Sequence, residues 1–435
     1  MEDEAMNTAG YVEQADARKC SKRYPQGRIT VEDNNLRTNV PVKGLMVKAR
    51  NFLKIKRTYT DINGNFRISK KYRKATIVVK WRNRLATTRG IDNWWKFYDI
   101  FFPIKFRIGQ FECGALDNIT FNFPFTADHR SLWNERFAAS HFLNSLWETY
   151  ESTRTDNINN PPNKLRVYLV ARWFNGAAFT PMFSQVYGRG FPIEEFMNLL
   201  QLKLGRAIKG ALKKLLLKNA PDIFIPTFTD RFGARQSEFP DQRTNTSYHE
   251  LGHAIHFAQV SGDYWKRNTY PAYGYNLVAY GGDYGPKNGP FAPFVGVTEM
   301  WGFYFGNTLT ARKYEQIWNT TGNNAAFTIW RTNANQLENN IPDDNINVAF
   351  ANDRSLSWIP FGYIHDMTDN GENAALTGVN DAVNTYTLNG AFRGMQFNVT
   401  DVCGYMEEVL RRNGFSQDLQ MRLMMDSYRW QCWAP

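Results

Sequence analysis

The sequence lacks several features that would assign a chain to a class at once. No run of 18 apolar residues occurs, which excludes a helix apolar enough to span a bilayer. The first residues, MEDEAMNTAGYVEQ, include neither a basic nor an apolar segment, so we expect no signal peptide in the chain as given. The 4 cysteines form no Cys-x-x-Cys pair, which argues against a cysteine-based metal knuckle and a dense disulfide scaffold. Cys403 and Cys432 are placed to join the C-terminal helices if the compartment is oxidising.

The charges are unevenly distributed along the chain. The net charge is +11, but residues 28–107 hold 20 Lys and Arg against 5 Asp and Glu, so the remainder sums to −4. This asymmetry indicates two domains with different surfaces. We expect a tail at 1–27, a basic domain at 28–112 and a nearly neutral domain at 113–435.

The basic domain has the pattern of a small β-sandwich. Alternating segments such as GLMVKAR (44–50) are typical of strands, and Asn63-Gly64 is typical of a hairpin turn because both residues tolerate positive φ. No aromatic RNA-binding pair or recognition-helix pattern accompanies the basic residues, so we expect no nucleic-acid partner. The charge favours contact with an anionic glycan or another anionic component of a cell surface.

The second domain has a mainly helical pattern with a small sheet. Apolar stripes predict helices at 128–152 and 192–218, and apolar runs predict strands at 164–173 and 222–228. The expected fold class is therefore α+β, a small N-terminal β-sandwich followed by a mainly helical domain.

One segment, NTSYHELGHAIHF (245–257), holds three of the 6 histidines. His249 and His253 are four residues apart, which places both imidazoles on one helix face, where they can bind one Zn²⁺ ion. Glu250 lies about 100° further round the helix, where a general base can take a proton from zinc-bound water. Ser247-x-x-Glu250 also fits a capping box at the helix start, but a capping box does not explain two histidines at ligand spacing.

The third metal ligand must come from further along the chain. His256 lies too far along the helix axis to complete a tetrahedron, so we expect it to have a packing role. Glu299 falls in a predicted helix with aromatic residues at 298–309, and a glutamate there needs a cation. Asp263, in the turn after the histidine helix, is the alternative ligand. The Gly-, Tyr- and Pro-rich segment 270–294 is predicted to form a loop over the cleft.

If a zinc-bound water attacks a carbonyl group, a side chain is also needed to donate to the negative charge that forms on the carbonyl oxygen. His365, next to Asp366, is the predicted donor. The sequence leaves several tyrosines as alternatives: Tyr363, Tyr273, Tyr275, Tyr280 and Tyr284.

Two segments carry a resemblance to known families. VPVKGLMVKAR (40–50), followed by YTDINGNFRI (59–68), resembles the transthyretin-like, carboxypeptidase-regulatory-type domain, usually an accessory module. HELGHAIH (249–256), followed by a helical glutamate, resembles the gluzincin group of zinc metallopeptidases. That resemblance implies a zincin-type domain at 113–435 in which His249, His253 and Glu299 bind Zn²⁺ and Glu250 is the general base. The 45 residues between His253 and Glu299 exceed the usual gluzincin spacing.

Together the two resemblances imply an extracytoplasmic bacterial zinc peptidase that acts on protein or glycoprotein substrates. The alternative is a zincin-fold surface binding protein or adhesin that recognises glycans or proteins and has lost catalysis. Glu250 favours the enzyme, because a catalytically dead descendant has no need of a general base.

Overall fold

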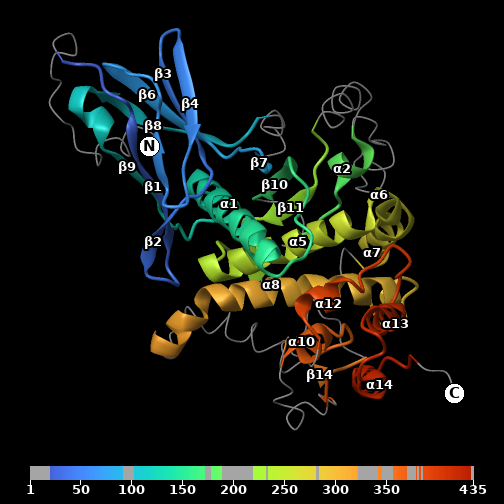
Figure 1. Cartoon of the computed structure of the whole chain (residues 1–435). Coiled ribbons are helices and arrows are strands. Elements are labelled where there is room, and N and C mark those ends of the chain that lie inside the picture. The colour runs from blue at the N-terminus through green and yellow to red at the C-terminus, as the bar shows by residue number, and fades with distance from the viewer. Residues whose placement is uncertain are drawn as a thin grey trace, which may run out of the picture.

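The structure is a computed structural model, and it describes residues 20–91, 102–171, 178–188, 219–231, 234–280, 284–321, 337, 341–344, 356–369, 379, 382–383 and 386–432. The helix predicted at 192–218 lies outside these residues. N-terminal sheets are followed by a helical region, so the α+β class is confirmed (Figure 1).

The N-terminal part consists of two four-stranded sheets. In the first, β1 (Gln26–Asp33) pairs with β2 (Thr38–Pro41), β5 (Asn65–Arg67) and, in parallel, β9 (Ile119–Phe123). The second is antiparallel, in the order β4 (Lys54–Tyr59), β3 (Met46–Asn51), β6 (Lys74–Lys80) and β8 (Lys105–Glu112). Alternate residues of both sheets, such as Ile29, Val31, Ile77 and Val79, are fully buried in one hydrophobic core. This period-two burial is what holds two sheets face to face.

Three segments depart from the boundaries expected for this part. Strand β9, expected in the second domain, pairs with β1 of the first sheet. Residues 20–27, expected in a tail, are tied to the sheets, because a disulfide joins Cys20 to Cys113 and Gly27 pairs with Phe66 and Ile119. A Cβ atom on Gly27 would lie 1.8 Å from the Ile119 carbonyl oxygen, so this strand contact requires glycine. Strand β7 (Ala86–Ile91) lies within the range expected for the sandwich but pairs in parallel with β10 of the second part.

In the residues that the structure describes, the second part combines a small parallel sheet with three long helices. The sheet has the order β11 (Ile223–Pro226), β10 (Leu165–Val170) and β7, which confirms the two strands predicted there. The long helices are α1 (Leu132–Thr155), α5 (Pro240–Val260) and α8 (Ala292–Thr321). The shorter elements are a 3₁₀ helix (Cys113–Asp117), α2 (Phe183–Tyr187), β12 (Thr229–Arg231), β13 (Ala234–Gln236), α6 (Gly262–Tyr264), a π-helical turn (Trp265–Thr269), α7 (Tyr270–Tyr280), β14 (Ile341–Pro342), β15 (Leu356–Ser357), α10 (Tyr363–Thr368), α12 (Leu388–Phe392), α13 (Val402–Arg412) and α14 (Asp418–Ser427).

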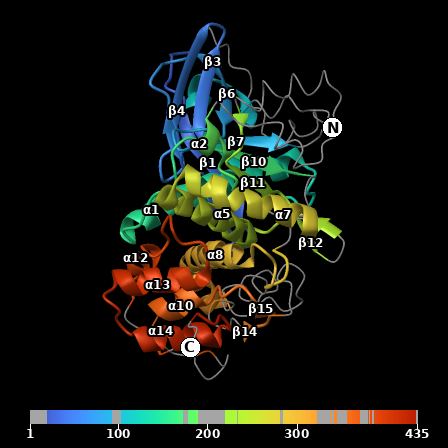
Figure 2. The ribbon, with the colours of Figure 1, turned by 90° about the vertical axis from the view of Figure 1, so that its right-hand side faces the viewer.

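Helix α5 lies between two hydrophobic cores (Figures 1 and 2). Leu251 and Ala254 belong to the core that includes the sheets and α1, whereas Tyr248 and Ile255 belong to the core of α8 and the C-terminal helices. A helix buried on two sides is held rigidly, which suits an element that carries a site.

A charged cluster joins the sandwich to the helices. The Glu148 carboxylate of α1 contacts the ammonium groups of Lys43, between β2 and β3, at 3.2 Å and Lys313 of α8 at 3.1 Å. Tyr248 of α5 donates its hydroxyl proton to the same carboxylate. Burial alone would raise the pKa of Glu148, but the two lysines and Tyr248 outweigh burial and lower it to about 2.

A second disulfide joins Cys403 of α13 to Cys432, the pairing that the sequence left open. Among the described residues, no helix is both long and apolar enough to cross a membrane.

Candidate metal centre

The histidine helix starts earlier than its sequence suggests. Helix α5 begins at Pro240 after the N-cap residue Phe239, because proline is favoured in the first turn, where its missing N–H costs nothing. Ser247 is therefore an interior residue, and its hydroxyl donates to the Arg243 carbonyl oxygen at 2.8 Å. The capping-box explanation of Glu250 is wrong. The helix ends at Val260. The C-cap residue Ser261 has a φ of 89°, which is incompatible with continuation of the helix.

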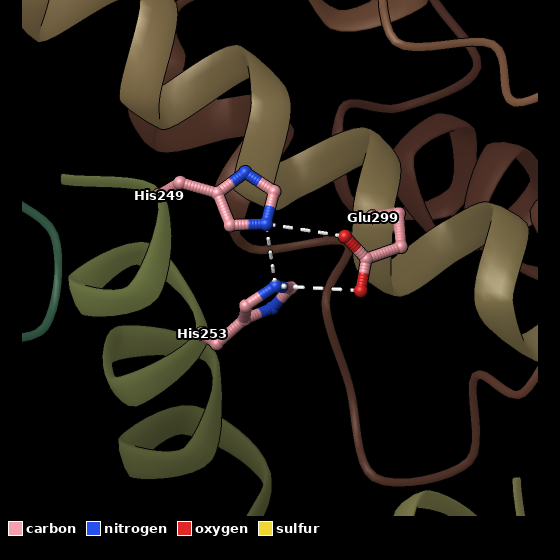
Figure 3. Close-up of side chains that lie close together, drawn as sticks. All are labelled: His249, His253 and Glu299. Carbon is pink, nitrogen blue, oxygen red and sulfur yellow. Dashed lines mark hydrogen bonds and ion pairs between the residues drawn. The ribbon is translucent and has the colours of Figure 1, made fainter. Parts of the chain in front are cut away.

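Three side chains from α5 and α8 meet at one point (Figure 3). The Nε2 atoms of His249 and His253 lie 3.0 Å apart. The two carboxylate oxygens of Glu299 lie 3.1 Å from His249 Nε2 and 3.4 Å from His253 Nε2. The side chains are 13, 3 and 6% exposed for His249, His253 and Glu299, so the group is buried but reachable from the His249 side.

These distances fit a metal ion. Ligands at about 2.05 Å from a tetrahedral Zn²⁺ lie about 3.3 Å from one another, and the three observed separations fall within 0.4 Å of that edge length. Two imidazoles and one carboxylate are also a ligand set that Zn²⁺ accepts. His249, His253 and Glu299 can therefore hold a metal ion. Asp263 is not part of this group, since its side chain is 69% exposed and pairs with Lys266.

The carboxylate of Glu299 is kept ionised in the core. Burial on its own would raise the pKa of Glu299, but the two adjacent histidines outweigh burial and hold it well below its usual range. Tyr284 donates a further hydrogen bond to Glu299 Oε2 at 2.9 Å. This tyrosine fixes the orientation of the carboxylate, as groups behind metal ligands commonly do.

Glycines allow α5 and α8 to approach closely enough to form the group. A Cβ atom on Gly302 would lie 2.8 Å from the Cε1 atoms of both His249 and His253. A Cβ atom on Gly306 would lie 3.1 Å from the Cβ atom of His249. Trp301 fixes the crossing by donating its indole N–H to the Gly252 carbonyl oxygen at 2.8 Å. The two imidazoles thus occupy space that a side chain on α8 would otherwise fill.

Glu250 is held beside the group by a contact that the sequence does not indicate. Its side chain is buried, and the hydroxyl of Thr180 donates to Glu250 Oε2 at 2.6 Å. Burial raises the pKa of the Glu250 carboxyl to about 7; His249 and Thr180 oppose this rise, and the charge of Glu299 adds to it. A carboxyl group with a pKa near neutrality can accept a proton and release it again.

The segment after α5 is helical, which makes the prediction of a loop over 270–294 wrong for 270–280. The residues after α5 hold the backbone at Thr180 and Pro181. The indole N–H of Trp265 donates to the Thr180 carbonyl oxygen at 3.3 Å, and the Tyr270 hydroxyl donates to the Pro181 carbonyl oxygen at 2.9 Å. Burial raises the pKa of the Tyr273 hydroxyl well above its usual value, and the charges of Glu299 and Glu250 add to that rise.

The other predicted residues lie in different surroundings. His365 is on α10, where its Nε2 atom lies 3.7 Å from Asp369 Oδ2. Tyr363 is buried and its hydroxyl contacts Met421 Sδ at 3.8 Å, which places it in the C-terminal core. His256 is buried against the rings of Tyr264 and Trp265, as its predicted packing role requires.

The comparisons with known proteins add no identification. No model of a known protein family matches the chain, no curated protein matches it, and no solved structure matches it. The function is therefore inferred from the described geometry, a buried His-His-Glu group that can hold a metal ion in an α+β fold.

Proposed function

We propose that the chain is a zinc-dependent peptidase of the gluzincin type. The observation that carries the proposal is the meeting of His249, His253 and Glu299 at tetrahedral edge distances, with Glu250 one residue beyond the first ligand. A Zn²⁺ ion held there would act as a Lewis acid toward the scissile carbonyl group and the attacking water. The resemblance of the sequence at 40–68 to transthyretin-like domains and the two disulfides support the proposal of an extracytoplasmic protein with protein or glycoprotein substrates.

Each residue then has a defined task. His249, His253 and Glu299 hold the metal ion, and Tyr284 orients Glu299 through its hydrogen bond. Glu250 takes a proton from the attacking water and passes it to the leaving amine. Thr180 binds Oε2 of Glu250, which orients Oε1 for that transfer. Tyr273 is a better supported donor to the carbonyl oxygen than His365, because the charges of both Glu299 and Glu250 act on its hydroxyl.

The first experiment measures bound metal in the purified protein beside two ligand variants. We expect about one zinc per chain, with affinity lost or strongly weakened in His253→Ala and Glu299→Ala. Asp263→Ala is the control and should bind as the wild type does. If the wild type takes up no metal when Zn²⁺ is offered, the proposal fails.

The second experiment tests hydrolysis, using mixed peptide and glycoprotein substrates with mass-spectrometric detection of new termini. Glu250→Gln should keep the metal and lose cleavage, while His365→Ala should keep both. Loss of turnover in His365→Ala with unchanged zinc content would restore the histidine to the site. A protein that binds zinc and glycans but cleaves no substrate would support the adhesin alternative.

A further inference from the structure

The hairpin between β3 and β4 carries an unusual pair of residues at its tip. Asn51 pairs with Lys54, so Phe52 and Leu53 are the two residues of the turn. Their exposed fractions are 91 and 85%, the highest among the large apolar residues that the structure describes. Scattered exposed apolar side chains are common, but two adjacent and almost fully exposed ones at the end of a hairpin are not.

The fold does not require these residues. Two-residue hairpin turns favour Asn-Gly and similar pairs, because the turn needs positive φ. Phe52 has a φ of 45°, which is unfavourable for a large side chain. The next turn of the same chain, at Asn63-Gly64, does use glycine at its position of positive φ, 75° at Gly64. It connects β4 and β5, which lie in different sheets, so the hairpin expected at this turn is a connection between sheets instead. An apolar pair in a strained, exposed turn therefore points to a contact outside the chain.

The sheet behind the tip is strongly basic. Pairing places Lys48 opposite Arg57 and Lys80 opposite Lys105 on its outer face. The cations of that face are Lys48, Arg50, Arg57, Lys74, Lys80, Lys105 and Arg107. In the described strands of this sheet, the acidic residue is Glu112, and it is neutralised by an ion pair with Lys74. The tip and its cationic face form one continuous surface of the β4-β3-β6-β8 sheet.

Two simpler explanations account for only part of this surface. Lysines on an edge strand prevent sheets from pairing edge to edge, but exposed Phe52 and Leu53 would promote such pairing. A dissolved polyanion would bind the cations but would gain nothing from an apolar tip. A bilayer with anionic head groups offers both partners, hydrocarbon at a shallow depth and phosphate above it.

The position of the hairpin suits such a contact. Figures 1 and 2 both show β3 and β4 at the end of the molecule away from α8 and the C-terminal helices. The metal group lies between α5 and α8. A surface bound at the hairpin would therefore lie at the opposite end of the molecule from α8, which carries Glu299 of the metal group.

We propose that the β3–β4 hairpin docks the protein on an anionic lipid bilayer, with Phe52 and Leu53 entering the interface and the basic sheet face contacting phosphate head groups. The contact is peripheral and reversible, since two side chains and a field of cations give far less binding energy than a spanning helix. This inference is independent of the proposed peptidase activity.

Vesicle co-sedimentation of the whole protein tests the proposal. Vesicles of phosphatidylcholine with about one third phosphatidylglycerol supply the anionic surface, and pure phosphatidylcholine vesicles supply the neutral one. We expect binding to the anionic vesicles at about 0.1 M NaCl and a fall of about tenfold or more on pure phosphatidylcholine or at about 0.5 M NaCl.

The decisive variant carries Phe52→Gly with Leu53→Asn, because in this turn the first residue has positive φ and the second does not, a geometry that favours glycine at the first position. It should keep or raise the melting temperature, so lost binding cannot be a folding defect. We expect its partitioning to fall about tenfold or more. The matched control is Phe415→Ser, since Phe415 is also exposed and has a φ of 58°, but it lies near α14.

Four outcomes would overturn the proposal. The first is that the wild type does not bind anionic vesicles, and the second is that it binds neutral vesicles equally well. The third is that the double variant at positions 52 and 53 binds as the wild type does. The fourth is that Phe415→Ser loses as much binding as the double variant. Retention on a sulfated polysaccharide column without vesicle binding would assign the basic face to an acidic glycan instead.

Discussion

Replacement of Gly302 by alanine is the sharpest perturbation of the metal centre, because it touches no ligand chemically. The added Cβ atom would lie 2.8 Å from the Cε1 atoms of His249 and His253 and 2.9 Å from His253 Nε2. Ordinary carbon contacts in protein interiors start near about 3.5 Å, so the imidazoles or the α8 backbone must move by more than half an ångström. Metal sites tolerate about 0.2 Å in ligand distance.

We therefore expect Gly302→Ala to weaken zinc binding by about 10- to 100-fold, the range found when the surroundings of metal ligands are disturbed. The helix itself should gain, since alanine is favoured over glycine by up to about 1 kcal/mol in a helix interior. The signature is thus a loss of metal affinity without a large loss of apo-protein stability. Competition with a chromophoric chelator measures the first, and thermal melting of the metal-free protein measures the second.

Gly404→Ala is the matched control. Gly404 is also inside a helix, α13, but a Cβ atom there would meet its nearest neighbour, Asp401 Oδ1, at 3.4 Å. Its zinc affinity should equal that of the wild type. If Gly302→Ala binds zinc as tightly as Gly404→Ala does, the close crossing of α5 and α8 does not shape the site.

Three further predictions concern other contacts. Thr180→Val should lower kcat by about tenfold with KM and zinc affinity unchanged, because only the orientation of the Glu250 carboxylate is lost; a changed zinc affinity would contradict that role. Glu148→Gln should cost on the order of 2 kcal/mol of folding stability at neutral pH, and the difference from wild type should shrink as pH falls below 4.5 toward about 2. The stabilisation is lost at low pH because folding lowers the pKa of Glu148. Denaturant unfolding at several pH values measures the stability difference between wild type and variant, and a difference that stays constant with pH would contradict the reasoning. Reduction of the two disulfides should lower the unfolding midpoint, because each cross-link restricts the unfolded chain. The sequence separations are 93 and 29 residues, which correspond to a stabilisation of about 4 to 5 and about 3 to 4 kcal/mol. An unshifted midpoint in reductant would contradict this.

The histidine spacing made the metal centre predictable, whereas its supports were not. A four-residue spacing fixes His249 and His253 on one helix face whatever surrounds them. Glu299 could be ranked above Asp263 because a carboxylate among buried aromatic residues needs a partner. Gly302 and Gly306 stand four residues apart in α8, a visible sign of close helix packing, but nothing in the sequence states which helix approaches.

The boundaries of α5 show where local pattern fails. Thr244 to Ser247 offered good capping side chains, yet the helix extends back to Pro240 because the added turn is buried by tertiary contacts, with Arg243 and Thr244 almost fully inaccessible. Strand β7 shows a related limit. Its sequence, ATTRGI, shows no clear alternation of apolar and polar residues, and its partner residues in β10 lie 79 positions further along the chain, Leu165 against Ala86.

Thr180 marks the deeper limit, because its role arises only in three dimensions. No motif surrounds it, and its place beside Glu250 depends on Trp265 and Tyr270, which follow α5 in the chain and hold the backbone at 180–181. The segment after α5 therefore holds Thr180, which orients the proposed general base Glu250, whereas the sequence predicted only a loop over the cleft for 270–294. Shortening that segment should impair proton transfer before it impairs metal binding, since both histidines belong to α5 itself. A deletion that removes zinc affinity first would show that the segment supports the ligands directly.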